Sequence, residues 1–269
     1  MSNRRWPIIT LLTDFGLKDP YVASMKGVIL SINPQCTLVD ITHQISPHDI
    51  IEGAFTLAQT YSTFPKGTIH LAVVDPGVGS PRKPILFVTP NYLFIGPDNG
   101  LFTIALQRER VKQAVVLRNQ KFFLSEVSST FHGRDIFAPV AAYLTLGVKP
   151  GSFGPSIKSW HQIPSPDPAM KQGKLIGEIV HIDTFGNLVS NIDYRILLKF
   201  SKSRLCVIKI GKRTMTGLQK GYWEGRRGEP MALIGSGGLL EISVREGNAQ
   251  KALKVEKGDR IVVQTVESP

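Results

Sequence analysis

The chain has few cysteines and no long hydrophobic run, and each absence excludes a class of protein. Its two cysteines, Cys36 and Cys206, lie far apart and form no CxxC or Cys/His spacing, which argues against a disulfide scaffold or a metal site. The apolar run from Ile8 to Leu12 falls far short of the ~18 apolar residues that a membrane span needs. The N-terminal stretch lacks a signal-peptide cleavage pattern. We therefore expect a cytoplasmic protein that engages no membrane.

Acidic residues are also scarce relative to basic ones. The 269 residues are 42% hydrophobic and 20% charged, as in a folded globular protein, but the net charge is +11. Ten basic residues lie between Arg195 and Arg227, against the single acid Glu224. Such a segment is either a solvated basic face or a nucleic-acid surface. Because few aromatic residues interleave with it and no nucleic-acid-binding motif is present, the sequence favours the solvated face.

Strand-like and helix-like segments alternate in the first part of the chain. Strand patterns occupy 6–13, 37–41, 68–74 and, as a pair turning at 90–91, 84–95. Helical patterns occupy 21–32, 50–61, 101–107 and 136–146. This alternation predicts an α/β domain with a mostly parallel sheet over residues 1–157.

Proline, glycine and serine then crowd into the chain, and the pattern changes after them. We expect residues 158–173 to form a linker, because such a composition propagates neither helix nor sheet. Apolar strand patterns follow at 174–183, 205–210, 231–234, 239–244 and 260–266, separated by glycine-rich turns. They predict an all-β barrel domain over residues 174–269.

Two acids, Asp14 and Asp19, follow the first predicted strand. The carboxyl ends of strands in open α/β sheets form ligand crevices, and a carboxylate there can accept from a pair of hydroxyls or an ammonium group. The same acids can instead close a turn and cap the next helix. The sequence alone leaves both interpretations open.

A second polar set follows the strand at 68–74. Asp75 leaves this strand, a glycine-rich loop turns, and Arg82 returns seven residues later, so the two can converge on one small polar species or form a structural ion pair. The loop lacks a Gly-Lys-Ser/Thr ending and a GxGxxG pattern, so no phosphate-binding fingerprint is supported. Further along, His132 lies beside a glycine, where it can titrate near neutrality, orient water or serve a structural role.

Two turns of the predicted barrel also carry polar or aromatic groups. In the segment 181–187, Phe185 can stack on a flat base while Asn187 pairs with its edge, or the segment can be an ordinary turn around a core phenylalanine. The segment 235–238 presents backbone amides and the Ser236 hydroxyl, or is only a hairpin.

Six ordered motifs together resemble the S-adenosylmethionine hydroxide adenosyltransferases, also called S-adenosylmethionine (SAM) hydrolases, a family related to fluorinase and chlorinase. The motifs are LTDFG at 12–16 with Asp19, VDPGVG at 74–79 with Arg82, GPDNG at 96–100, TFHGRD at 130–135, DTFGN at 183–187 and LEI at 240–242. They span nearly the whole chain.

The resemblance implies both an architecture and an activity. It implies an α/β domain followed by a β-barrel, in a homotrimer whose substrate lies between the N-terminal domain of one subunit and the C-terminal domain of its neighbour. It implies attack of water or hydroxide on the ribose 5′ carbon of SAM, releasing adenosine and L-methionine with no cofactor or metal. The family's water-activating residues fall on Asp75, Arg82 and His132. Either Asp75 or His132 can take the proton.

The resemblance also implies roles in substrate binding. It places Asp14 on the ribose diol and Asn187 on the adenine edge. We expect Asp19, in the Asp14 loop, and Phe185, beside Asn187, to bind the substrate as well. Its remaining positions, at the methionine end and around the pocket, are Asp183, Ser236, Glu241 and the backbone near Val244.

Two alternatives are weighed against hydrolysis. A chlorinase-like halogenase is disfavoured because an anionic Asp75 repels a halide, and because the chain from Arg82 to Pro97 leaves no room for the halogenase loop. A non-enzymatic, basic nucleic-acid- or nucleotide-binding protein is disfavoured because the acids at the strand ends repel phosphates.

Overall fold

A computed structural model describes residues 7–164 and 167–266 of the chain. The chain divides into two compact units, residues 1–164 and 165–269. This boundary falls within the stretch 158–173, which the composition predicts to be a linker.

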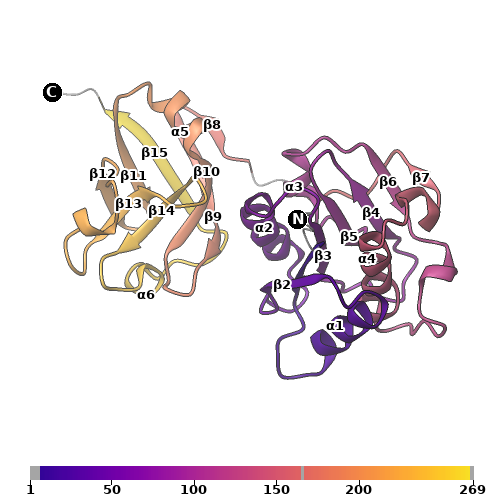
Figure 1. Ribbon diagram of the computed structural model, residues 1–269. Helices are drawn as coiled ribbons and strands as arrows, with labels where there is room; N and C mark the ends of the chain where they lie inside the picture. The colour runs from indigo at the N-terminus through magenta and orange to yellow at the C-terminus, as the bar shows by residue number, and fades with distance from the viewer. Residues whose placement is uncertain (1–6, 165–166, 267–269) are drawn as a thin grey trace, which may run out of the picture. The chain divides into compact units, whose positions relative to one another are not determined.

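A seven-stranded sheet forms the centre of the N-terminal unit (Figure 1), in the order β2-β1-β3-β5-β4-β6-β7. The strands are β1 (Ile8–Thr13), β2 (Thr37–Thr42), β3 (Ile69–Val73), β4 (Pro84–Val88), β5 (Leu93–Pro97), β6 (Gln113–Val116) and β7 (Ser156–Ile157). Strands β2, β1, β3 and β5 pair in parallel, whereas β4 is antiparallel to both β5 and β6. Five strands thus point the same way, which confirms the predicted, mostly parallel α/β sheet.

Helices cover both faces of this sheet. Helices α1 (Tyr21–Ile32) and α4 (Ala138–Thr145) share one hydrophobic cluster with the sheet. Helices α2 (Ile50–Thr60) and α3 (Thr103–Gln107) share another. Within β1, Leu11 belongs to the first cluster and Leu12 to the second, because successive side chains of a strand point to opposite faces. The central strands are buried on both sides for this reason.

The predicted helix at 21–32 coincides with α1, and the predicted strand pair at 84–95 becomes the hairpin of β4 and β5. The long apolar stretch at 136–146 is less regular than predicted. A π-helical turn, η3 (Gly133–Phe137), precedes α4 there. Residue Trp6, at the start of the first predicted strand, lies outside the described residues.

The C-terminal unit is a barrel-like antiparallel sheet, as predicted, in the order β12-β11-β15-β9-β10-β14-β13, with β8 beside β9. The strands are β8 (Ala169–Lys171), β9 (Lys174–Ile182), β10 (Leu188–Asp193), β11 (Leu205–Ile210), β12 (Arg213–Thr216), β13 (Pro230–Ile234), β14 (Leu239–Val244) and β15 (Arg260–Val266). The two ends of this order, β12 and β13, also contact each other. A separate hydrophobic cluster fills the unit, including Leu188, Ile208 and Ile261.

Two short helices supplement the barrel, α5 (Tyr194–Ser201) and α6 (Ala249–Leu253). Asp193 caps α5 by accepting a hydrogen bond from the Arg195 amide, and Lys202 ends it in the left-handed conformation. Asn248 caps α6 by accepting from the Lys251 amide. Neither helix was predicted, although both carry capping residues typical of helix starts. Among the described residues, no helix is long and apolar enough to cross a bilayer.

Candidate active site

Polar side chains follow the carboxyl ends of adjacent parallel strands in the N-terminal unit. Strands β1 and β3 are neighbours, and Thr13 at the end of one pairs with Val73 at the end of the other. Asp14 therefore emerges close to the point where Asp75 leaves β3. Asn99, just after β5, donates from Nδ2 to the Val74 carbonyl at 2.8 Å and braces the peptide that precedes Asp75. This edge of the sheet is the position at which α/β proteins bind ligands.

The glycine-rich loop after β3 folds back so that Arg82 meets Asp75. Arg82 donates from Nε to Asp75 Oδ1 at 3.0 Å and from Nη2 to Asp75 Oδ2, which is the two-pronged arrangement that a guanidinium forms with a carboxylate. Gly79 has a φ of +76°, and a Cβ there would collide with the carbonyl oxygen of Ser129. A glycine is required at this position because the loop packs directly against the segment that carries His132.

Arg82 also joins this pair to His132. Its Nη2 lies 2.8 Å from His132 Nδ1, and a guanidinium can only donate, so Nδ1 is the acceptor. The imidazole is therefore neutral and carries its proton on Nε2. Burial and the neighbouring Arg82 charge lower the pKa of His132, although Asp75 and Asp135 act in the opposite direction. We call Asp75, Arg82 and His132 the polar triad.

The polar triad is held in place from two sides. The side chains of Arg82 and Asp75 are only 9% and 5% exposed, and the Phe137 ring lies 5.4 Å from the guanidinium carbon. Phe137 is placed by the π-helical turn that follows His132, a local irregularity common at functional sites. Within that turn the buried Asp135 accepts from the Ser128 amide at 2.8 Å and so ties down the preceding loop.

One donor of the polar triad has no partner. Arg82 Nη1 is buried and meets no hydrogen-bond acceptor among the described residues. Leaving a buried donor unpaired costs free energy, so such atoms are rare and often mark a position that a ligand occupies. An anionic or lone-pair-bearing atom would satisfy Nη1.

Asp14 is tied to the loop that precedes α2, and Asp19 does not cap the helix that follows it. The His48 amide donates to Asp14 Oδ2 at 2.9 Å. Helix α1 begins after Pro20 without a side-chain capping hydrogen bond, and Asp19 is exposed. Asp14 therefore links two loops that are distant in the sequence, and its other carboxylate oxygen remains as a further acceptor.

Aromatic rings connect the Asp14 loop with the His132 loop. Phe15, Tyr21 and Phe131 form three edge-to-face pairs with centroids 5.2–5.8 Å apart. With Ser128, Thr130 and Arg134 they line a cavity of about 320 Å³. None of the three rings was predicted as a site residue. Phe15 directly follows Asp14 and Phe131 directly precedes His132, which was the available signal, whereas Tyr21 adjoins neither.

In the C-terminal unit, the turn after β9 is organised by Asp183. Its Oδ1 accepts from the amides of Phe185 at 2.9 Å and Asn187 at 2.8 Å, and its Oδ2 accepts from Asn187 Nδ2 at 2.8 Å. Both carboxylate oxygens thus serve the turn. The Phe185 ring is 76% exposed, whereas Asn187 is 8% exposed. The ring is not a core residue and offers its surface for stacking.

The remaining predicted positions lie on or beside β13 and β14. Glu241 is buried and its Oε1 accepts from the hydroxyls of Tyr222 and Ser243 at 2.8 and 2.7 Å. Burial and the hydrogen bond to Glu241 raise the pKa of Tyr222 to about 12. Ser236 is exposed in the turn between the two strands. The side chain of Val244 packs in the barrel core, so only its backbone is available to a ligand.

A broad groove of about 1030 Å³ lies elsewhere on the C-terminal unit. Its basic lining residues are Lys171, Lys174, Lys209, Lys254 and Arg260. Their positive charge would repel a cationic ligand, so this groove does not suit a sulfonium compound. Among the described residues, no group of three or more His, Cys, Asp or Glu side chains is arranged to hold a metal ion.

The fold and these side chains define a two-domain α/β-plus-barrel protein with a polar centre at the carboxyl edge of its sheet. Residues 9–154 match the SAM hydroxide adenosyltransferase N-terminal domain, and residues 177–262 match the C-terminal domain of the same family. The chain belongs to the SAM hydroxide adenosyltransferase family, as its motifs indicate.

Several known proteins are similar to this chain, three of those below over nearly its full length. A protein of Thermus thermophilus named (R)-S-adenosyl-L-methionine hydrolase is 35% identical over 93% of this chain and 96% of its own. One of the same name from Methanocaldococcus jannaschii is 36% identical over 95% of each chain. A fluorinase of Actinoplanes sp. is 29% identical over 69% of this chain and 72% of its own. A crystal structure of an uncharacterized conserved protein from Thermotoga maritima, 36% identical, superposes with a TM-score of 0.90 and covers 95% of this chain and 99% of that one.

Proposed function

We propose that this chain hydrolyses SAM to adenosine and L-methionine. Its family and its relatives named (R)-S-adenosyl-L-methionine hydrolase, 35% and 36% identical over nearly the whole chain, support this activity. The observation that carries the proposal is the buried Arg82, fixed between Asp75 and His132 with Nη1 unpartnered. A water or hydroxide oxygen is the smallest ligand that satisfies this donor.

The reaction is a displacement at the ribose 5′ carbon. The oxygen held by Arg82 forms a bond to C5′ while the C5′–S bond breaks, and the electron pair returns to sulfur as the neutral thioether of methionine. The sulfonium is already a good leaving group, so the protein has only to exclude water, align the nucleophile and favour its hydroxide form. The reaction we propose uses no cofactor or metal.

The proton released by the water goes to Asp75 or His132. Asp75 already accepts two hydrogen bonds from Arg82, but a carboxylate has further lone pairs. His132 can receive the proton at Nδ1 only when Arg82 withdraws its hydrogen bond. A positioned base of this kind contributes roughly 10²–10⁴ in rate.

Substrate binding is assigned to the remaining predicted residues. Asp14 accepts from the ribose diol through its remaining oxygen, near Asp19. Phe185 stacks on the adenine, and Asn187 pairs with the adenine edge through its amide, of which Asp183 engages one hydrogen. The methionine end is left to Asp183 and Ser236, and Glu241 with the Val244 backbone completes the pocket.

We further propose a cytoplasmic homotrimer in which each site combines the N-terminal unit of one subunit with the C-terminal unit of its neighbour. Co-expression of His132→Ala with Asn187→Ala tests this arrangement. If sites form between subunits, random mixing leaves about one quarter of them intact, because each variant supplies the half that the other lacks. If sites form within one subunit, no activity returns. Light scattering measures the subunit number directly.

The activity itself is tested by incubating the purified protein with SAM in chloride buffer and separating the products by chromatography with mass detection. We expect adenosine and methionine, with a loss of about 10²–10⁴ in rate for His132→Ala. A chlorinated nucleoside would instead place the chain with the halogenases. Unchanged SAM together with salt-dependent RNA binding would favour a nucleic-acid-binding protein that uses the basic groove.

A further inference from the structure

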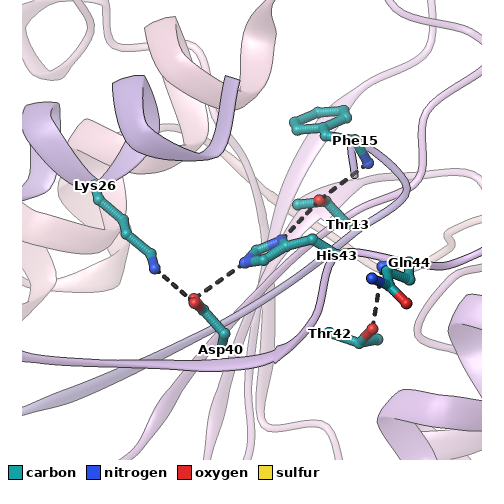
Figure 2. Close-up of polar contacts among 7 residues, drawn as sticks. All are labelled: Thr13, Phe15, Lys26, Asp40, Thr42, His43 and Gln44. Carbon is teal, nitrogen blue, oxygen red and sulfur yellow. Dashed lines mark hydrogen bonds and ion pairs between the residues drawn. The ribbon is translucent and has the colours of Figure 1, made fainter. Parts of the chain in front are cut away.

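A second polar network, buried at its Thr13–His43 end, lies at the same edge of the N-terminal sheet (Figure 2). His43 directly follows β2, which pairs with β1, and is only 3% exposed. Its Nδ1 lies 2.9 Å from Thr13 Oγ1, and its Nε2 lies 3.0 Å from Asp40 Oδ1. Lys26 from α1 donates to Asp40 Oδ2 at 2.6 Å. We call Lys26, Asp40, His43 and Thr13 the Lys26–Thr13 chain.

The hydrogen bonds of the Lys26–Thr13 chain fit an orientation that runs from Thr13 toward Asp40. Thr13 Oγ1 accepts from the Phe15 amide at 3.2 Å, and its hydroxyl hydrogen is then available to His43 Nδ1. In this orientation His43 carries its proton on Nε2, which faces Asp40 Oδ1 at 3.0 Å as a close polar contact rather than a well-aligned hydrogen bond. Partial burial opposes the charge on Asp40, but the hydrogen bond from Lys26 and the neighbouring His43 outweigh it and lower the pKa of that carboxyl. Asp40 is thereby kept anionic beside both groups.

The Lys26–Thr13 chain ends on the loop that carries Asp14. Thr13 and the Phe15 amide flank Asp14 in the sequence, and the Gly16 amide donates to the His43 carbonyl at 2.7 Å. His43 therefore holds the loop both through its ring and through its backbone. From the other side, the His48 amide fixes Asp14 Oδ2 at 2.9 Å.

We propose that the Lys26–Thr13 chain positions Asp14 to receive the ribose diol of the substrate, an inference that rests on the proposed function. Its members do not contact the substrate. They fix the loop before substrate arrives, so less conformational freedom is lost on binding. Removing a hydrogen bond of the Lys26–Thr13 chain therefore weakens recognition of the diol much more than it slows the chemical step.

The same strand offers a matched control. Thr10 on β1 is buried and lies 2.8 Å through Oγ1 from Nδ1 of the buried His70. This pair repeats the chemistry of Thr13 and His43 but lies three residues further from the Asp14 loop. Thr10→Val removes an equivalent hydrogen bond without touching the loop.

The test compares the affinities of adenosine and 2′,3′-dideoxyadenosine, measured by calorimetry. In the wild type, we expect adenosine to bind more tightly because it carries the diol. Thr13→Val should reduce this preference by about tenfold and raise the KM for SAM by a similar factor, with kcat changed less than about threefold. Thr13→Ser, which keeps the hydroxyl, should restore the preference, and Thr10→Val should retain it.

Turnover of SAM by the wild type is measured first, because an inactive wild type overturns the proposed function. An active wild type whose diol preference is unchanged in Thr13→Val overturns only the positioning role. So would an equal loss in Thr10→Val, which would indicate general damage to the sheet. If Thr13→Val does not fold, Lys26→Gln breaks the chain at its more exposed end. A loss of preference of about threefold is expected there, on the order of one surface ion pair, and an unchanged preference would contradict the proposal.

Discussion

In the N-terminal unit the side chains of Asp75 and Arg82 are buried and bonded to each other, whereas in the C-terminal unit Phe185 and Ser236 are exposed. The Asp75 side chain is 5% exposed and pairs with Arg82, while the Phe185 ring is 76% exposed. The difference indicates a division of labour. Reactive groups need a fixed geometry and a dry environment before the substrate binds. An aromatic ring that only stacks on a ligand can stay exposed to solvent until the ligand binds. In the C-terminal unit, the buried Glu241 fixes Tyr222 by accepting a hydrogen bond from its hydroxyl.

The largest effect is expected from removing the centre of the polar triad. Arg82→Ala leaves Asp75 as a buried carboxylate without its partner and removes the Nη1 donor, so kcat should fall by at least about 10³-fold. Arg82→Lys should recover only part of this, because an ammonium cannot form the two-pronged contact. Steady-state kinetics on SAM measures both.

Arg227 provides the control for charge removal. It pairs with Glu246 on the surface, and its side chain is 80% exposed. Arg227→Ala should change kcat less than about twofold. An equal loss for Arg227→Ala and Arg82→Ala would remove the distinction between a buried reactive centre and a surface ion pair.

A second effect concerns acid stability of the N-terminal unit. His70 is fully buried, and burial lowers its pKa from 6.5 to about 3. The unfolded chain therefore binds a proton that the folded chain excludes, and stability falls as the pH drops from about 6.5 toward about 3. Between pH 6.5 and 4.5 this residue should cost about 2–3 kcal/mol.

The measurement is the free energy of unfolding in denaturant at pH 6.5 and pH 4.5 for the wild type and His70→Leu. Other groups titrate in the same range, so the informative quantity is the difference between the two proteins. The variant should lose less stability on acidification. Parallel pH dependences would mean that His70 is protonated in the folded protein.

The smallest effect is expected at the exposed platform of the C-terminal unit. Phe185→Ala should raise the KM for SAM by roughly tenfold through lost stacking, with little change in kcat. Because the ring is 76% exposed, its loss should change the free energy of unfolding by less than about 0.5 kcal/mol. Tyr194→Ala, at a ring 43% exposed on α5, should leave the KM unchanged. A KM effect of equal size there would contradict a specific role for Phe185.

The sequence predicted those parts of the fold that depend on local pattern. The apolar spacing at 21–32 matched α1, and the runs at 205–210, 239–244 and 260–266 matched β11, β14 and β15. Helix α5 was missed because it is short and lies in the basic segment, although Asp193 marks its start. The π-helical turn before α4 was missed because its apolar residues also fit an α-helical pattern.

In the candidate site, too, only contacts between residues close in the sequence could be predicted. Sequence spacing brought Asp75 and Arg82 together because they lie on one loop, but the contact between Arg82 and His132 joins residues fifty positions apart and depends on tertiary packing. The Lys26–Thr13 chain was not predicted because its members come from three separate elements. Each is unremarkable in sequence and gains its role from the pairing of β1 with β2.

Hydrolysis of SAM in water enriched in oxygen-18, with mass detection of the nucleoside, shows whether the nucleophile is a water held by the polar triad. We expect adenosine heavier by one oxygen-18 at its 5′ hydroxyl, formed by the wild type and lost in Arg82→Ala. Adenosine without the label, a halogenated nucleoside, or full activity in Arg82→Ala would contradict attack by a water that the polar triad holds.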